Sequence, residues 1–179
     1  MATALLVIDV QRALCTGDEA AYAIDEVIGR INGLSRAARA ATVPVVLVQH
    51  EEAGSPLSHG SQGWQLDARV EVAPADLRVR KTSPDSFYET ALDTLLRERQ
   101  VTRLVLCGLQ TEFCIDTTVR RALSLGYDVV LASDAHSTSQ SDTLSAAQIV
   151  AHHNRTLRWL GGFAASIVVA PAQEVRVAG

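Results

Sequence analysis

Aromatic residues make up only 4% of the 179 residues, and the chain contains three cysteines, Cys15, Cys107 and Cys114. An odd and sparse set of thiols argues against a disulfide framework and favours a reducing compartment, so we expect a cytoplasmic protein. No apolar run approaches the roughly 18 residues that cross a membrane. The stretch MATALLVIDV lacks a basic region and is interrupted by Asp9, which argues against a signal sequence.

A large excess of either sign of charge is also absent, with 16 basic and 20 acidic residues. The formal net charge is −4, so the sequence carries no electrostatic footprint for nucleic acid or an anionic membrane, and we expect neither partner. Apolar residues make up 47% and charged residues 20%, which is ordinary for a soluble globular protein. With no internal repeat or low-complexity tract, the length favours a single domain over residues 1–179.

Short apolar runs alternate with longer segments of helical periodicity. We expect strands at 4–8, 43–48, 77–81, 103–107, 129–132 and 166–170, and helices at 18–41, 85–99, 111–126 and 141–159. The alternation of basic and apolar residues in 77–81 indicates a strand near the edge of the sheet. Strands alternating with helices indicate an α/β fold: an open, doubly wound, mainly parallel sheet of about six strands with helices on both faces, a Rossmann-like three-layer sandwich.

Cys114 is placed in the first turn of an expected helix. Thr111 is the expected N-cap, and Glu112 is an acid where the helix dipole favours one. The positive end of the dipole and the free N–H groups of a first turn favour a thiolate, and the same N–H groups can hold an oxyanion. The alternative is that Cys114 is a small buried apolar residue, as we expect for Cys107 inside its strand.

Polar side chains follow several expected strands. Asp9 comes directly after the first, Lys81 ends the third, and His136 lies in a polar segment, 133–141, after the fifth. Because the carboxyl ends of parallel strands meet at one edge, we expect these residues to converge there with Cys114, which points to an enzyme site. Taken singly, Asp9 also fits a turn and Lys81 a solvated charge.

His50, Glu52 and His59 flank a long Gly/Ser-rich loop that leads to Trp64. Together they offer metal-binding side chains, but their spacing matches no recognised ligand pattern. We therefore interpret this segment as a solvated loop and expect no metal site.

Three separated motifs carry a resemblance that spans nearly the whole chain: LLVIDVQ, the segment around Lys81, and GLQTEFCIDTTVRRALSLGYDVVLASDAHS. They resemble the isochorismatase-like cysteine hydrolases, which include small amidases. The resemblance implies a catalytic triad of Asp9, Lys81 and Cys114. It also implies a non-proline cis peptide at Leu109–Gln110, which aims the N–H of Gln110 alongside that of Cys114.

The resemblance implies a cysteine-dependent amidohydrolase that cleaves a small carbonyl–nitrogen bond through a thioester, as a homo-oligomer without a cofactor. Metal-dependent relatives carry Asp-x-His where this chain has Gln49-His50-Glu51-Glu52, so no zinc site is carried over. Many relatives carry an aromatic pocket residue at the end of the first motif, where this chain reads DVQRAL and has Leu14. We therefore assign Leu14, together with Trp64, to the substrate pocket. The alternatives are an isochorismatase-type vinyl-ether hydrolase and a non-catalytic thiol or redox module. His136 is the second candidate for the base.

Overall fold

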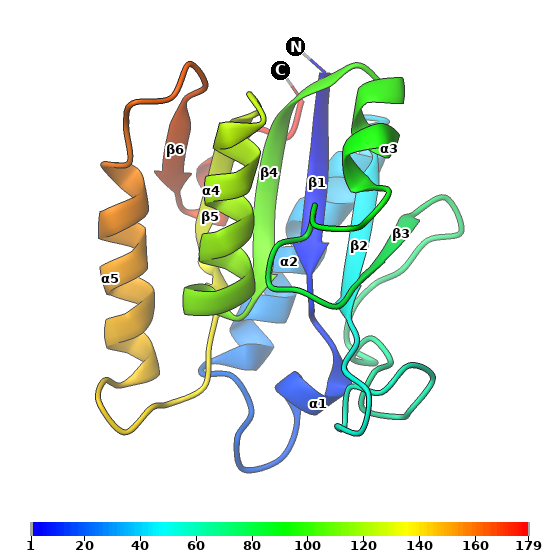
Figure 1. The fold of residues 1–179 in the computed structure, drawn as a ribbon, viewed down its shortest axis with the longest axis vertical. Coiled ribbons are helices and arrows are strands. Elements are labelled where there is room, and N and C mark those ends of the chain that lie inside the picture. The colour runs from blue at the N-terminus through cyan, green and yellow to red at the C-terminus, as the bar shows by residue number, and fades with distance from the viewer. Residues whose placement is uncertain (1, 179) are drawn as a thin grey trace.

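The computed structural model describes residues 2–178 and forms a six-stranded sheet with helices on both faces (Figure 1). Its strands are β1 (Ala2–Ile8), β2 (Val45–His50), β3 (Leu77–Lys81), β4 (Val101–Leu109), β5 (Asp128–Ser137) and β6 (Ile167–Ala170). Its α-helices are α1 (Arg12–Cys15), α2 (Ile24–Ala40), α3 (Leu92–Glu98), α4 (Asp116–Ser124) and α5 (Ala146–Arg158). A π-helical turn, η1 (Thr111–Ile115), precedes α4, and a 3-10 turn, η2 (Ala172–Glu174), follows β6. No helix within residues 2–178 is long and apolar enough to cross a membrane.

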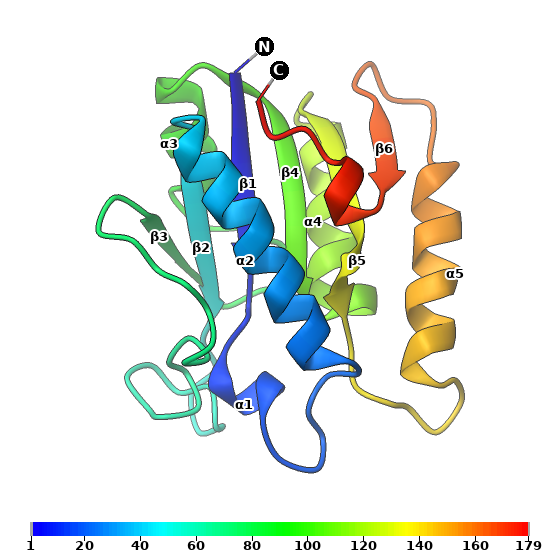
Figure 2. The ribbon, with the colours of Figure 1, turned by 180° about the vertical axis from the view of Figure 1, so that it is seen from behind.

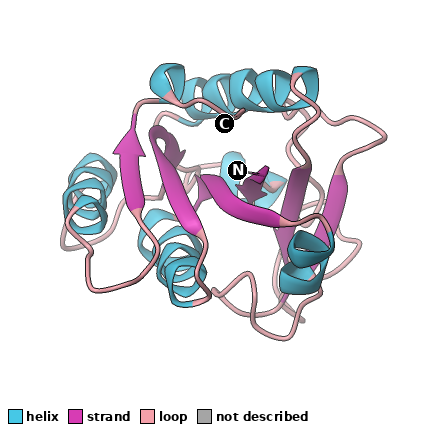
Figure 3. Cartoon of the chain, turned by 90° about the horizontal axis from the view of Figure 1, so that it is seen from above, coloured by secondary structure: helices cyan, strands magenta, loops and turns pink. Residues whose placement is uncertain are grey.

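The strand order is β3-β2-β1-β4-β5-β6, and every neighbouring pair is parallel. The helices α3, α4 and α5 cover one face of the sheet, whereas α2 and η2 cover the other (Figures 2 and 3). The order reverses between β1 and β4, which creates the topological switch point where such sheets place their ligands. The predicted three-layer α/β fold is therefore confirmed, with β3 at the predicted edge.

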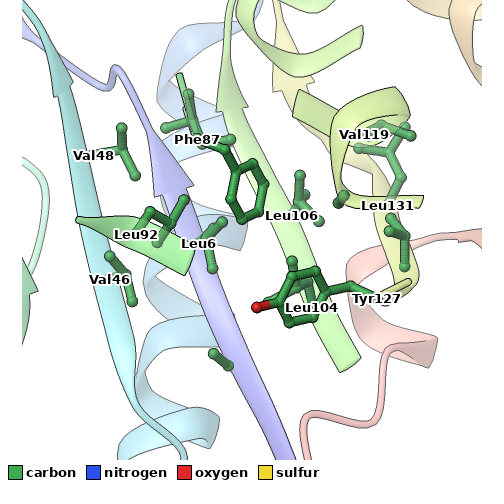
Figure 4. Packing of buried hydrophobic residues seen from close by; sticks show 14 of the residues in the cluster. Leu6, Val46, Val48, Phe87, Leu92, Leu104, Leu106, Val119, Tyr127 and Leu131 are labelled. Carbon is green, nitrogen blue, oxygen red and sulfur yellow. The ribbon is translucent and has the colours of Figure 1, made fainter. Parts of the chain in front are cut away.

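The core consists of two apolar layers because successive side chains of a strand point to opposite faces. In β1, Ala4, Leu6 and Ile8 join the layer beneath α3 and α4, while Leu5 and Val7 join the layer beneath α2. Figure 4 shows the first layer, in which strand side chains meet others from the covering helices. A strand buried on both faces reads as a continuous apolar run, which explains why the sequence reveals β1 clearly.

The predicted starts of α3, α5 and α2 are wrong, and for α3 and α5 the cause is side chains that bond to nearby backbone. Residues 85–91 form turns instead of the start of α3: Asp85 accepts from the Phe87 N–H at 2.8 Å, and Thr90 accepts from the Leu92 N–H at 3.2 Å. The helix α5 begins after a capping box of Ser145 and Gln148, not at Ser141 or Asp142. The predicted start of α2 at residue 18 is also wrong, since that helix begins at Ile24.

The strand β5 runs on through the segment that the sequence analysis assigns to a polar loop. It continues to Ser137, and a register shift between Leu106 and Gly108 brings His136 opposite Gly108 of β4. Polar composition suggested a loop here, but ladder hydrogen bonds with β4 and burial keep the backbone extended.

Candidate active site

Three polar side chains meet at the carboxyl ends of the strands around the switch point. Asp9 directly follows β1, Lys81 is the last residue of β3, and Cys114 lies in η1 just after β4. The long lysine side chain extends from the edge strand past β2 toward the end of β1. The structure thus brings together the three residues that the sequence analysis singled out.

Lys81 holds the group together. Its Nζ lies 2.7 Å from Asp9 Oδ2 and donates to Cys114 Sγ at 3.1 Å and to the carbonyl oxygen of Ser83 at 3.0 Å. The Lys81 and Asp9 side chains are only 0% and 1% exposed, so water screens their attraction little. The ion pair is therefore fixed in geometry.

The Asp9 backbone has a left-handed conformation, with φ of 52°. This conformation is costly for a residue other than glycine, and two hydrogen bonds hold it: the Asp9 N–H donates to Val48 O at 2.9 Å, and the Gln11 N–H donates to Asp9 O at 2.8 Å. Oδ2 pairs with the Lys81 ammonium, and Oδ1 has no hydrogen-bond partner within residues 2–178. The carboxylate thus keeps lone pairs with which to accept a proton.

The expectation of a thiolate at Cys114 is wrong in direction. Burial, together with the neighbouring Asp9 carboxylate, raises the pKa of Cys114 to about 12, although Lys81 acts to lower it. Burial alone would lower the pKa of Lys81, but Asp9 and the Cys114 sulfur outweigh burial and raise that pKa. At neutral pH the resting site therefore holds a thiol beside a charged ion pair.

The turn that carries Cys114 differs from the predicted helix start. Residues Thr111–Ile115 form a π-helix, which is common at functional sites, and the residue before it is Gln110. Thr111 is not the N-cap: its buried hydroxyl pairs with His136 Nδ1 at 2.9 Å. The Leu109–Gln110 peptide bond is cis, and the Gln110 side chain donates to Ser139 Oγ at 3.3 Å.

His136, the second candidate for the base, is engaged elsewhere. Asn154 donates through Nδ2 to Ser133 O at 2.8 Å, which leaves its Oδ1 facing His136 Nε2 at 3.0 Å. Nε2 must then carry the ring proton, and Nδ1 accepts from the Thr111 hydroxyl. Burial lowers the pKa of His136 to about 4. Both ring nitrogens are thus occupied, so neither is free to accept a further proton.

The two residues assigned to the substrate pocket lie in the neighbouring loops. Leu14 is half-buried in α1 and packs against the apolar layer beneath α2. Trp64 is half-buried with its ring 4.6 Å from that of His59, and its carbonyl oxygen accepts from Gln11 and Gln49. These contacts position both residues beside the end of β1. Their assignment to the substrate pocket stays a prediction.

The candidate metal ligands do not come together. Across residues 2–178, no three histidine, cysteine, aspartate or glutamate side chains are grouped closely enough to hold a metal ion. His59 packs on Trp64, whereas His50 Nδ1 lies 3.4 Å from the Lys81 ammonium, where a second cation would be repelled.

Sequence reasoning missed Gln11, which is fully buried. Its Nε2 donates to the carbonyl oxygens of His50 and Trp64, each at 2.9 Å, and its Oε1 accepts from the His50 N–H at 2.8 Å. This side chain ties the end of β1 to the end of β2 and to the following loop. The available signal was its place two residues after Asp9, at the end of the LLVIDVQ motif. A separate signal, which concerns Lys81, was that this residue is the only lysine in the sequence.

The protein is thus a three-layer α/β protein. A buried Asp-Lys-Cys group at the switch point of its parallel sheet forms a candidate cysteine site. Residues 3–157 match the isochorismatase domain, and the chain belongs to this family. It is 40% identical over 173 residues to a streptothricin hydrolase of Streptomyces noursei, covering 92% of this chain and 61% of that protein. It therefore spans about three fifths of that relative's length.

Two further relatives agree with this membership. A ureidoacrylate amidohydrolase, RutB, of Variovorax paradoxus is 30% identical over 170 residues, which cover 74% of this chain and 68% of that protein. The crystal structure of an isochorismatase family protein superposes with a TM-score of 0.85 at 37% identity, covering 93% of this chain and 97% of the other.

Proposed function

We propose that this chain is a cysteine-dependent hydrolase that cleaves the carbonyl–nitrogen bond of a small amide through a thioester acyl-enzyme. One observation carries the proposal: the Lys81 ammonium contacts both the Asp9 carboxylate, at 2.7 Å, and the Cys114 sulfur, at 3.1 Å. The name of one relative, streptothricin hydrolase, supports hydrolysis, and that of another, ureidoacrylate amidohydrolase, supports an amide-type substrate.

In the first half of the proposed reaction, Asp9 removes the thiol proton as Cys114 attacks the carbonyl carbon. The raised pKa of the thiol requires such a base, because little thiolate is present beforehand. A carbon–sulfur bond forms, and the carbonyl π electrons move onto oxygen. When they return, the carbon–nitrogen bond breaks, and Asp9 gives its proton to the leaving amine. The product is a neutral thioester beside an ionised Asp9.

In the second half, Asp9 accepts a proton from water, and the resulting hydroxide attacks the thioester carbon. The carbon–sulfur bond breaks, the acid product leaves, and the proton returns to Cys114. Lys81 stays charged throughout and keeps Asp9 oriented. We assign the developing oxyanion to the backbone N–H groups of Gln110 and Cys114, and assign Leu14 and Trp64 to the substrate pocket.

The wider setting belongs to the same proposal. We propose a single catalytic domain over residues 1–179 that works in the cytoplasm as a homo-oligomer on a small-molecule substrate, without a cofactor or metal. The sparse cysteines and the absence of a recognised ligand spacing support the compartment and the metal-free chemistry.

A panel of small primary, cyclic and ureido amides tests the proposal. Hydrolysis is followed by ammonia release and, because cyclic amides release none, by the gain of one water in the product mass. We expect turnover of at least one amide, an acyl adduct on Cys114 by mass spectrometry, and complete loss of both in Cys114→Ala. Cys15→Ala, which alters a thiol outside the site, is the matched control.

Three results contradict the proposal. Turnover that survives Cys114→Ala excludes the thioester route. Pyruvate release from isochorismate, with every amide untouched, assigns the chain to vinyl-ether hydrolysis instead. A Cys114 that only oxidises reversibly, with no turnover of any substrate, indicates the redox module.

A further inference from the structure

The ammonium group of Lys81 has more acceptors in reach than protons to donate. Its Nζ lies 2.7 Å from Asp9 Oδ2, 3.0 Å from Ser83 O, 3.1 Å from Cys114 Sγ and 3.4 Å from His50 Nδ1. An ammonium carries three N–H donors, and this one is fully buried, so water does not compete. Asp9 and Ser83 take two protons at the shorter oxygen contacts. Cys114 and His50 therefore share the third.

The position of His50 is built into the fold. His50 and Lys81 are direct partners in the parallel ladder of β2 and β3, so their side chains lie on the same face of the sheet. The buried Gln11 side chain holds the His50 backbone at both its N–H and its carbonyl oxygen. The imidazole is thus fixed at the side of the ammonium.

The imidazole of His50 is also neutral, which is the protonation state that can accept a hydrogen bond from Lys81. Burial and the nearby Lys81 lower the pKa of His50, against the opposite effects of Asp9, Glu52 and the Ser83 carbonyl group. The ring is therefore neutral at pH 7. With its proton on Nε2, it presents the Nδ1 lone pair to Lys81.

The need for this acceptor changes along the proposed reaction. A thiolate is a strong acceptor for the third N–H of Lys81, but a sulfur bonded to substrate carbon is neutral and a weak one. At the tetrahedral stage Asp9 is protonated and no longer an anionic acceptor, so the ammonium depends more on Ser83 O and His50 Nδ1. A buried ammonium that lacks a partner is costly.

We propose that His50 is a positioning residue, whose Nδ1 accepts the third Lys81 N–H whenever the Cys114 sulfur is bonded to substrate. It keeps the ammonium in place through both halves of the reaction. This inference rests on the proposed function of the Asp9, Lys81 and Cys114 group.

Two substitutions separate the acceptor from the bulk of the side chain. His50→Leu keeps an apolar side chain of similar size but removes the acceptor, whereas His50→Asn places an amide oxygen near the position of Nδ1. We expect kcat and kcat/KM to fall together by about 10-fold or more in His50→Leu with KM unchanged, because the contact matters in the transition state. His50→Asn should recover most of this loss. His152→Ala, on the exposed side of α5, is the control and should behave as the wild type.

Lys81 also gives a direct spectroscopic readout, since it is the only lysine and ¹⁵N-lysine labelling yields a single side-chain ammonium signal. We expect this signal to shift and to exchange faster with water in His50→Leu, and to return toward the wild-type position in His50→Asn. Should His50→Leu fail to fold by circular dichroism, His50→Ala replaces it with the same expectation.

Normal kinetics and an unchanged lysine signal in the folded acceptor-free variant overturn the inference. Equal losses in the Leu and Asn variants with an unchanged lysine signal overturn it too, because they indicate a purely structural role. Cys114→Ala is assayed alongside. If it keeps turnover, the proposed function fails; if it is inactive while His50→Leu is normal, only the inference about His50 fails.

Discussion

The thiol of Cys114 lies between two charged neighbours of opposite sign. Burial is the largest cause of its raised pKa of about 12, the Asp9 carboxylate adds to it, and the Lys81 ammonium acts against it. A nucleophile that stays protonated at rest is protected from adventitious oxidation, since the thiolate is the reactive form. In the proposed mechanism it becomes reactive only when Asp9 takes the proton.

Asp9→Asn separates thiolate formation from turnover. It removes one of the charges that raise the thiol pKa and leaves Lys81, so we expect faster alkylation of Cys114 by iodoacetamide at pH 7. Turnover should nevertheless fall by about 10²–10⁴, because Asn cannot donate a proton to the leaving amine or activate water. Labelling is measured by peptide mass spectrometry and turnover by steady-state kinetics.

Asp18→Asn, an exposed carboxylate away from the site, is the control and should change neither rate. Cys15 and Cys107, which are 2% and 0% exposed, should label slowly in all three proteins. Near-normal turnover in Asp9→Asn removes Asp9 from the role of base. Slower labelling of Cys114 in that variant contradicts the electrostatic account of its pKa.

At the scale of elements, the close approach of β1 and β4 positions Asp9, the proposed base. Gly108 of β4 pairs with Ile8, the residue before Asp9, at a φ of 121°. A Cβ at this position would lie 2.0 Å from the Ile8 carbonyl oxygen. Only glycine allows the two backbones to come this close where β1 ends.

Gly108→Ala should therefore destabilise the protein by more than about 3 kcal/mol, or displace the end of β1 and reduce kcat. The matched control is Gly126→Ala after α4, where φ is also positive, at 90°, but no atom lies within 4 Å of the added methyl group. We expect that control to cost about 1–2 kcal/mol with normal activity. Urea denaturation and kcat are measured for both. Equal stability losses in the two variants would show that the contact with Ile8 has no effect.

The elements also show how far the sequence predicts this structure. Every strand was predicted: most are continuous apolar runs, as buried strands of a parallel sheet are, with β1 the clearest, whereas the edge strand β3 was predicted from its alternation of basic and apolar residues. The end of β5 was missed because Ser133 to Ser137 is polar, and its extended backbone depends on pairing with β4, which no local pattern encodes. The π-helical form of η1 was missed for a similar reason. It depends on tertiary contacts such as that of Thr111 with His136.

For the site, the sequence identified which residues converge but not how they interact. The order of strands and polar residues was enough to bring Asp9, Lys81 and Cys114 to one edge. The direction of the thiol pKa was predicted wrongly, because burial and the distance to Asp9 are properties of the folded chain. The contacts of His50 with Lys81 and of Gln11 with His50 also require the strand register, which only the structure provides.

At the scale of the whole molecule, His136 joins three elements on the α5 side of the site. It lies in β5, pairs with Thr111 of η1 through one ring nitrogen and faces Asn154 of α5 through the other. The ring is 2% exposed, and its burial lowers the pKa to about 4. An imidazolium is disfavoured here because burial deprives its charge of water, and the hydrogen bond to Asn154 only partly offsets that cost.

The stability of the fold should therefore fall in mild acid. The unfolded His136 takes up a proton near pH 6.5, whereas the folded one resists until about pH 4, so the unfolded state binds protons first as the pH drops. The contribution of the neutral ring to the free energy of unfolding is complete above pH 6.5 and is lost progressively down to pH 4, a change of about 3 kcal/mol.

Urea unfolding at pH 7, 5.5 and 4 measures this loss of stability. His136→Gln, which has no ring to titrate, should lose about 3 kcal/mol less over this range, while carboxylates lowered in pKa, such as Asp67 and Asp93, act equally in both proteins. If both proteins lose the same stability between pH 7 and 4, His136 is not the group that limits the fold in acid.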